Sequence, residues 1–232
     1  MRKYSVITDV GNKRAVNQDN YFVGDNWCIV ADGMGGHKGG EVASKAAIEI
    51  IKKGIKQQSF GIEALLKNVI IQANRAIYDM SLNDPELEGM GTTAVLCYFE
   101  DKTAYIAHVG DSRAYHLSDD TFVQLTNDHS IVQNLIESGT ITPQEAKNHP
   151  QKNLITRAIG TDSTIEVDIC KVSLKKGDYI MLCTDGLTSF LSDSEIKTII
   201  KTMDSDEAVT KLVDMANSNG GTDNITIVLI LV

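Results

Sequence analysis

Four aspartates lie beside or close to glycines where apolar runs of the sequence begin or end: Asp32, Asp111, Asp185 and Asp223. A carboxylate at the end of a buried strand is held rigidly near the rim of its sheet, and a neighbouring glycine lets the backbone bend sharply toward a ligand. Several such ends would collect negative charges, which repel one another unless a cation or protons neutralise them. Carboxylate oxygens are hard ligands that suit Mg²⁺ or Mn²⁺. Because Asp-Gly is also a common turn, the pattern leaves a metal centre and a set of ordinary turns both open.

Two other features have the chemistry to bind a phosphate. Arg14 stands just before Asn17-Gln18-Asp19, and a guanidinium near a metal centre can grip a phosphate through two hydrogen bonds, although a lone arginine is often a solvated surface residue. Residues 33–40 contain five glycines ahead of an expected helix, where backbone amides can cradle an anion. That run lacks both the P-loop ending and the GxGxxG spacing, so it does not predict a nucleotide-binding fold.

These residues must be positioned by strands and helices. Short β-branched runs predict strands over 4–8, 27–31, 92–99, 103–109, 113–117, 121–125, 165–172, 179–184 and 225–232. The brief links between residues 92 and 125 predict an antiparallel meander. Apolar periodicity predicts helices over 42–53 and 62–80. Capping-box spacings at Ser192, Asp204 and Thr142 predict three more helix starts. Hairpin-paired strands with helices segregated in sequence indicate α+β layers.

Composition limits the class of protein. The chain has 22 Lys and Arg against 31 Asp and Glu, a net charge of −9, which argues against nucleic acid or an anionic membrane as partner. Its longest apolar run, Ile225–Val232, is far shorter than the roughly 20 residues of a membrane-spanning helix. No apolar segment follows the basic N-terminus, so no signal peptide is expected. The four cysteines are dispersed without CxxC spacing, which favours reduced thiols in a cytoplasmic protein. With no linker evident, one continuous domain is the simplest organisation.

Eight short motifs follow one another along the chain. They are residues 14–19 (RAVNQD), 32–37 (DGMGGH), 91–93 (GTT), 110–113 (GDSR), 128–130 (DHS), 156–160 (TRAIG), 184–186 (TDG) and 223–226 (DNIT). In this order they resemble the bacterial branch of the metal-dependent (type 2C, PPM) serine/threonine protein phosphatases. The resemblance extends from about Thr8 to Val232. It implies a four-layer αββα sandwich, in which two antiparallel β-sheets are flanked by pairs of antiparallel helices, and a single catalytic domain over residues 1–232.

The resemblance also implies a metal centre of two core ions, Mn²⁺ or Mg²⁺. Asp32 would bridge both ions, Asp185 and Asp223 would complete one, and the carbonyl of Gly33 would help to hold the other. Asp111 would bind a third, weaker ion together with Asp185. Hydrolysis would use a water shared by the two core ions, which attacks phosphorus in line with the Ser or Thr oxygen.

Residues around the ions receive roles from the same resemblance. Arg14 would bind the substrate phosphate, which makes it, with Asp32 and Asp185, one of the implied catalytic residues. Asp19 would act on the ions through water, and Asn224 would be a second outer-shell residue. The segment from about 130 to 156 matches a flap beside the cleft.

The proton donor to the leaving group stays open. Eukaryotic relatives have a histidine where Met34 stands, and the bacterial branch commonly has methionine. His37 and a metal-bound water are the two candidates.

Other phosphatase mechanisms fit poorly. An aspartyl nucleophile needs a DxD at a strand end, but the one DxD, at 204–206, has the features of a helix start, and no Cys-x5-Arg loop occurs. A non-catalytic phosphoprotein-binding module and a phosphatase of small phosphorylated metabolites remain as alternatives; the former would be expected to have lost metal carboxylates. The expected protein is a cytoplasmic monomer that acts on phosphoserine and phosphothreonine proteins, opposes a bacterial Ser/Thr kinase, and neither binds nucleic acid nor inserts into a membrane.

Overall fold

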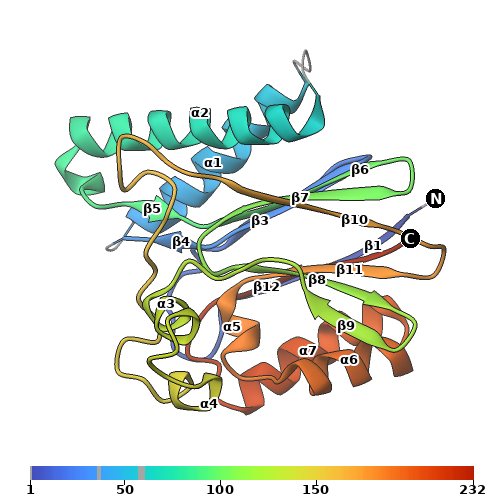
Figure 1. Ribbon diagram of the computed structural model, residues 1–232. Helices are drawn as coiled ribbons and strands as arrows, with labels where there is room; N and C mark the ends of the chain where they lie inside the picture. The colour runs from blue at the N-terminus through green and yellow to red at the C-terminus, as the bar shows by residue number, and fades with distance from the viewer. Residues whose placement is uncertain (1, 36–37, 57–60) are drawn as a thin grey trace.

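The computed structural model describes residues 2–35, 38–56 and 61–232, and it has the four layers that the resemblance implies (Figure 1). The first antiparallel sheet, here the β1 sheet, has the order β1 (Lys3–Asp9), β12 (Ile225–Leu231), β11 (Tyr179–Cys183), β8 (Arg113–Ser118) and β9 (Thr121–Gln124). The second, the β3 sheet, has the order β10 (Asp168–Ser173), β7 (Thr103–Val109), β6 (Ala94–Glu100), β3 (Trp27–Ala31) and β2 (Asn20–Val23). The predicted sandwich is confirmed.

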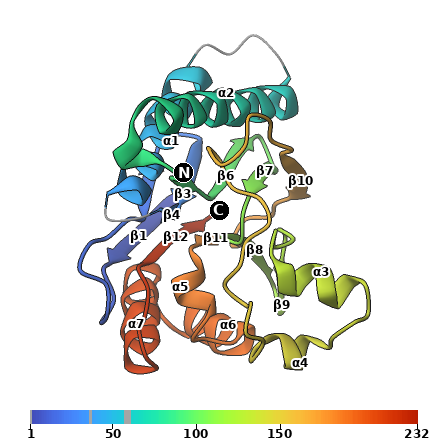
Figure 2. The same cartoon turned by 90° about the vertical axis from the view of Figure 1, so that its left-hand side faces the viewer.

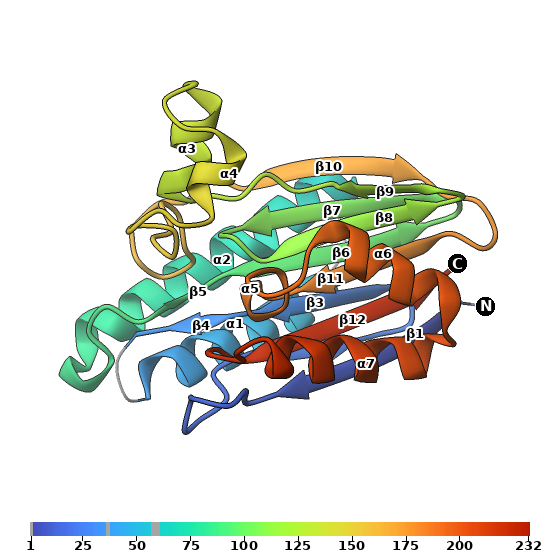
Figure 3. The ribbon, with the colours of Figure 1, turned by 90° about the horizontal axis from the view of Figure 1, so that it is seen from below.

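Two helices cover the outer face of each sheet (Figures 1 and 3). The β3 sheet packs against α1 (Gly39–Ile55) and α2 (Ile62–Asn83), and the β1 sheet packs against α6 (Asp193–Thr202) and α7 (Ser205–Ser218). The shorter elements are the strand pair β4 (Gly33–Met34) and β5 (Gly91–Thr92), the 3-10 turn η1 (Pro85–Leu87), and the helices α3 (Ile131–Glu137), α4 (Pro143–Ala146) and α5 (Asp185–Thr188). No helix in the described part of the chain combines the length and apolar character needed to cross a bilayer.

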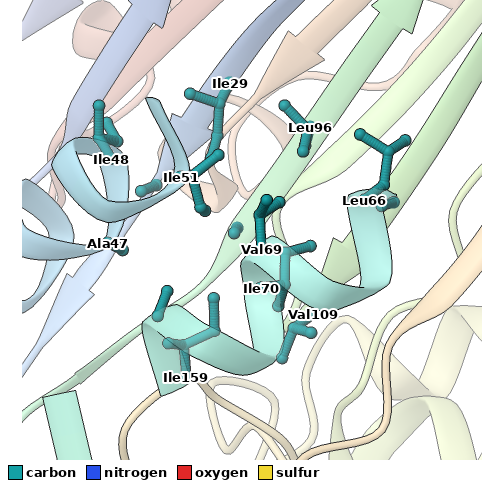
Figure 4. Close-up of a cluster of buried hydrophobic side chains, with 14 of the residues drawn as sticks. Ile29, Ala47, Ile48, Ile51, Leu66, Val69, Ile70, Leu96, Val109 and Ile159 are labelled. Carbon is teal, nitrogen blue, oxygen red and sulfur yellow. The ribbon is translucent and has the colours of Figure 1, made fainter. Parts of the chain in front are cut away.

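The core consists of three apolar layers. Between the two sheets, Val30, Ile106 and Val228 are fully buried. Figure 4 shows the layer between α1, α2 and the β3 sheet, where Ile51 and Ile70 point toward the strands. A comparable layer lies between the β1 sheet and α6 and α7. Central strands are therefore buried on both faces, which explains why their sequences are continuous apolar runs rather than alternating ones.

The predicted meander over residues 92–125 is wrong at its middle link. The pairs β6–β7 and β8–β9 are hairpins, but β7 and β8 belong to different sheets. The link Gly110–Ser112 crosses from one sheet to the other, and Gly110 turns the chain with a φ of +102° that favours glycine. The length of a short link does not indicate whether the chain turns back within one sheet as a hairpin or crosses to the other sheet.

Several other boundaries differ from the sequence-based expectation. The predicted strand 92–99 divides into β5 and β6, and the predicted strand 165–172 begins at Asp168. The elements β2, β4, η1, α3 and α5 were not predicted, because each is too short to show a clear periodicity. Capping boxes form at Thr142 and Ser192 as expected. Asp204 also caps its helix, but its side chain accepts from the amide of Asp206, two residues on, so a full capping box is not formed there.

Adjacent isoleucines of α2 provide a test of this packing. Ile70 is fully buried against the β3 sheet, whereas Ile71 is 41% exposed. We expect Ile70→Ala to lower the free energy of unfolding by about 2–5 kcal/mol, because it leaves a cavity, and Ile71→Ala to lower it by less than about 1 kcal/mol. Denaturant unfolding of the two variants measures this difference. Equal losses would contradict the packing of α2 described here.

Candidate metal centre

The ends of strands from both sheets meet at one end of the sandwich, the end that faces the viewer in Figure 2. A cleft of about 690 Å³ opens there. Six predicted site residues line it: Arg14, Asp32, Gly33, Asp111, Asp185 and Asp223. The structure thus brings together residues that are spread over more than two hundred positions of the sequence.

Asp32 is held by its backbone at the end of β3. Its carbonyl accepts hydrogen bonds from the Thr93 amide (2.8 Å) and the Thr92 hydroxyl (2.8 Å), and its amide donates to the Thr93 hydroxyl (2.9 Å). Next to it, a Cβ on Gly33 would lie 2.1 Å from the carbonyl oxygen of Gly40, so only glycine fits between this strand end and α1. The carboxylate of Asp32 is therefore presented from a rigid base.

Asp185 and Asp223 come from neighbouring strands of the β1 sheet. Asp185 begins α5 with one residue between it and the end of β11, and one residue separates Asp223 from the start of β12. A Cβ on Gly186 would lie 2.0 Å from the Asn224 carbonyl oxygen, so the two segments are in close contact. The backbone amide of Asn224 donates to one oxygen of Asp223 (2.8 Å), and the guanidinium of Arg14 donates to the other (2.8 Å). These contacts orient both carboxylates toward the same space.

Asp111 is placed by the corner that joins the two sheets. The neighbouring Gly110 exchanges two hydrogen bonds with His129: its amide donates to Nδ1 (3.0 Å), and its carbonyl accepts from the His129 amide (3.0 Å). On the other side, the hydroxyls of Ser112 and Thr93 share a hydrogen bond of 2.7 Å. The corner thereby connects Asp111 to the start of the segment 130–156 as well as to both sheets.

Asp19 does not line the cleft but lies buried beneath it. One carboxylate oxygen accepts from the hydroxyls of Thr184 (2.9 Å) and Thr226 (2.7 Å), next to Asp185 and at the start of β12. The other oxygen, Oδ1, is buried without a hydrogen-bond partner. This position is compatible with the predicted indirect role.

Burial and mutual repulsion raise the pKa values of these carboxyls. The pKa of Asp185 is raised to about 6 and that of Asp111 to about 8, in both cases first by desolvation and next by a neighbouring aspartate. Desolvation likewise raises the pKa of Asp19 to about 7. The pKa of Asp32 is raised well above its usual range, by desolvation and by the charges of Asp19 and Asp185.

This donor set fits a divalent cation. Oδ1 of Asp185, like Oδ1 of Asp19, is buried without a hydrogen-bond partner. Hard oxygen donors with unsatisfied lone pairs and raised pKa values are the environment that Mg²⁺ or Mn²⁺ stabilises. Protons supply the missing positive charge when no cation is bound.

Arg14 and Asn224 have different surroundings. The Arg14 side chain is 51% exposed at the cleft rim and pairs with Asp223. The side-chain amide of Asn224 is buried and forms three hydrogen bonds with the backbone. Its oxygen accepts from the Gln18 amide (2.8 Å), and its nitrogen donates to the carbonyls of Val10 (2.9 Å) and Val16 (3.1 Å). Asn224 therefore fixes the loop that carries Arg14.

A second cluster of possible ligands, His108, His129 and Asp168, lies outside the cleft. Nδ1 of His129 is engaged by the Gly110 amide, and Nη1 of Arg157 lies 3.0 Å from Nε2 of His129 and 2.7 Å from Asp168. A guanidinium thus already supplies the positive charge at this cluster. We interpret it as a structural ion-pair network.

The cleft also includes residues that sequence reasoning did not single out. Gln18 and Thr93 belong to the motifs 14–19 and 91–93, so their positions in those motifs could have predicted them as cleft residues. No motif or periodicity predicts Asn153 and Ile155 as cleft residues, because they belong to an irregular segment. Met34 lines the cleft, and His37, the alternative proton donor, lies outside the described residues.

Comparison with known proteins agrees with this geometry. Residues 11–226 match the family model described as protein phosphatase 2C. The chain belongs to the protein phosphatase 2C family. It is 39% identical over 234 residues to the serine/threonine phosphatase stp of Listeria innocua, covering 96% of this chain and 93% of that protein. The predicted membership of the bacterial type 2C phosphatases is confirmed.

Solved structures of this family have the same fold. The crystal structure of the Mycobacterium tuberculosis serine/threonine phosphatase PstP/Ppp matches with a TM-score of 0.94 at 36% identity, over 100% of this chain and 98% of that one. A structure of the PstP catalytic domain in complex with two manganese ions matches with a TM-score of 0.91 at 35% identity, over 99% and 97% of the two chains.

The raised pKa values predict how pH affects the metal-free protein. Unfolded aspartates ionise near pH 4, whereas Asp185, Asp19 and Asp111 in the fold hold protons up to about pH 6, 7 and 8. Stability in chelator should therefore decline as the pH rises from about 4 to about 8, because the unfolded state loses protons first.

Substitution of Asp111 tests this pH dependence. In chelator at pH 8, Asp111→Asn should raise the melting temperature, since it removes one repelling charge, and at pH 4 it should have little effect. Asp214→Asn, on the exposed face of α7, is the matched control and should change neither value. A melting temperature for Asp111→Asn that falls at pH 8 would contradict the electrostatic account.

Proposed function

We propose that this protein is a metal-dependent phosphatase that hydrolyses phosphoserine and phosphothreonine in proteins. The observation that carries the proposal is the convergence of Asp32, Asp111, Asp185 and Asp223 on one cleft with Arg14 at its rim. Membership of the protein phosphatase 2C family supports the same reaction. A non-catalytic phosphoprotein-binding module is disfavoured, because all four carboxylates predicted to bind metal line the cleft.

The resemblance to the type 2C phosphatases assigns ligands to two Mn²⁺ or Mg²⁺ ions, and the assigned residues all line the cleft. Asp32, on the cleft floor at the end of β3, would contact both ions. Asp185 and Asp223 would complete one of them, and the Gly33 carbonyl would contribute to the other. Asp111, at the corner between the sheets, would hold a third and weaker ion together with Asp185. When bound, such ions lower the pKa of water and offset charge on phosphoryl oxygens.

The remaining residues bind and orient. Arg14 would bind the phosphoryl group through the guanidinium N–H groups that Asp223 does not occupy, because only one of its nitrogens pairs with that carboxylate. Asn224 would keep the Arg14 loop in place through its three backbone hydrogen bonds. Asp19 would orient the strand ends that carry Asp185 and Asp223 through Thr184 and Thr226.

The organisation of the protein forms part of this proposal. Residues 1–232 would be one catalytic domain, with residues 130–156 as a flap beside the cleft; Ser130 and Ile155 pair where this segment leaves and rejoins the body. Free cysteines, three of them buried, support a reducing cytoplasmic location. We expect the enzyme to act as a monomer, which light scattering after gel filtration measures.

Metal dependence tests the proposed reaction. The purified protein should release phosphate from a phosphothreonine peptide with Mn²⁺ present and lose this activity in excess chelator. Asp32→Asn should lower kcat by about a hundredfold or more while the fold is retained, since it removes a charge that the ions require. Phosphate-release kinetics together with circular dichroism measure both effects. Full activity in chelator would contradict the metal mechanism.

Arg14 tests the phosphate-binding assignment. We expect Arg14→Ala to raise KM for a phosphopeptide by about tenfold with a smaller effect on kcat, because it removes charge-assisted hydrogen bonds made in the ground state as well as in the transition state. Arg75→Ala, on the exposed face of α2, is the matched control. An unchanged KM in Arg14→Ala would remove this role from Arg14.

A further inference from the structure

One buried polar side chain lies on the face of α2 that packs against the β3 sheet. It is Asn74, which is 1% exposed and lies on the same face as Ile70 and Ile77, both fully buried. Every other buried residue of α2 is apolar. A buried side-chain amide costs free energy unless its oxygen and nitrogen form hydrogen bonds, so the partners of Asn74 show what it holds in place.

Both ends of the Asn74 side chain bind the loop that follows the segment 130–156. Its oxygen accepts from the backbone amide of Gly160 (2.7 Å), and its nitrogen donates to the carbonyl of Asp162 (2.9 Å). Residues 157–162 form no helix and only a single β-bridge. Within the described part of the chain, the backbone of this loop is hydrogen-bonded to two residues outside it, Asn74 and Thr92. Asn74 is therefore one of two polar anchors of the loop.

The contact between this loop and α2 is tight. Gly160 has a φ of +93°, which favours glycine, and a Cβ there would lie 2.2 Å from Cγ2 of Ile77. The preceding residue, Ile159, is fully buried in the apolar layer between α2 and the β3 sheet (Figure 4). Steric contact thus keeps the loop from approaching the helix more closely, and the two hydrogen bonds of Asn74 keep it from moving away.

Ile159 connects the loop to the metal cleft. It exchanges two backbone hydrogen bonds with Thr92 of β5: the Thr92 amide donates to its carbonyl (3.0 Å), and its amide donates to the Thr92 carbonyl (2.8 Å). Thr92 in turn pairs with Gly33 of β4, and its hydroxyl donates to the carbonyl of Asp32 (2.8 Å). A continuous series of hydrogen bonds therefore runs from Asn74 to the strand end that carries Asp32 and Gly33.

We propose that Asn74 is a positioning residue for the metal centre, which acts through the loop 158–162 and Thr92 to hold Asp32 and Gly33 in place. This inference rests on the proposed metal-dependent function and adds to it a residue of the outer helical layer. Asn74 does not line the cleft, so it is not a catalytic residue. Hydrogen-bonding partners that orient metal ligands typically change metal affinity or activity by about 10- to 100-fold when they are removed.

Direct measurement of Mn²⁺ binding tests this role. Asn74→Leu retains a side chain of similar size but removes both hydrogen bonds, and we expect it to raise the dissociation constant for Mn²⁺ about tenfold. Electron paramagnetic resonance of free Mn²⁺ in equilibrium with the purified protein measures this constant without substrate. At saturating Mn²⁺, kcat for a phosphothreonine peptide should fall while KM stays within about twofold of the wild-type value, because Asn224 holds the Arg14 loop independently.

Two further variants separate positioning from a general loss of stability. Leu66→Ala, about two turns before Asn74 on the same buried face, should destabilise the fold but leave the dissociation constant for Mn²⁺ unchanged. Thr92→Val removes the hydroxyl that binds the Asp32 carbonyl, so it should weaken Mn²⁺ binding. Combined with Asn74→Leu, it should raise the dissociation constant by less than the product of the two single effects, because both residues act through the same contacts.

The possible results lead to different conclusions. An unchanged dissociation constant in Asn74→Leu, or an equal rise in Leu66→Ala, would overturn the positioning role, and independent effects of Asn74→Leu and Thr92→Val would overturn the connection through Thr92. If Asn74→Leu does not fold, Asn74→Ala, which leaves room for water at the freed backbone groups, replaces it and should also weaken Mn²⁺ binding. A wild-type protein that binds Mn²⁺ but hydrolyses no phosphopeptide would contradict the proposed function alone, since the Mn²⁺ constants would still decide the role of Asn74. A wild-type protein that binds no Mn²⁺ would contradict both.

Discussion

Repulsion among carboxylates that share one cleft is the constraint on which the rest of this structure depends. Asp32, Asp111, Asp185 and Asp223 face the same space, and desolvation raises the pKa values of Asp32, Asp111 and Asp185. Apolar residues in place of these four aspartates would relieve the repulsion but would remove the carboxylate ligands. Divalent cations would instead turn these charges into ligands and would offset part of the net charge of −9.

A cluster of this kind persists only where the backbone cannot move apart. Two sheets packed through a dry layer supply that rigidity, and each aspartate stands where a strand of one of them ends or begins. Close contacts at Gly33 and Gly186 exclude even a methyl group, so the strand ends are locked against their neighbours. The corner at Gly110 then adds a carboxylate from the link between the sheets. Stability in the sandwich thus compensates for electrostatic strain at its end.

The sequence predicted the elements whose signal is local and missed those whose signal is not. Periodicity located α1 and α2, and β-branched runs located most strands, because burial between two layers requires continuous apolar residues. The sheet change at Gly110–Ser112 was missed, since the length of a link does not encode the direction in which it leaves a sheet. The order of the motifs predicted that Asp32, Asp185 and Asp223 share one cleft. The position of Asn153 at this cleft follows only from the three-dimensional placement of the irregular segment 130–156. The backbone role of Asn224 likewise depends on contacts with Val10 and Gln18 that are distant in sequence.

Anomalous diffraction from crystals grown with Mn²⁺ would show whether the cleft carboxylates hold metal ions, because it locates the ions independently of activity. We expect two strong manganese peaks in the cleft, both next to the carboxylate of Asp32, with Asp185 and Asp223 as further ligands of one. In Asp32→Asn crystals under the same conditions, both peaks should weaken. An empty cleft in crystals of the wild-type protein, or manganese bound at His108, His129 and Asp168 instead, would contradict this expectation.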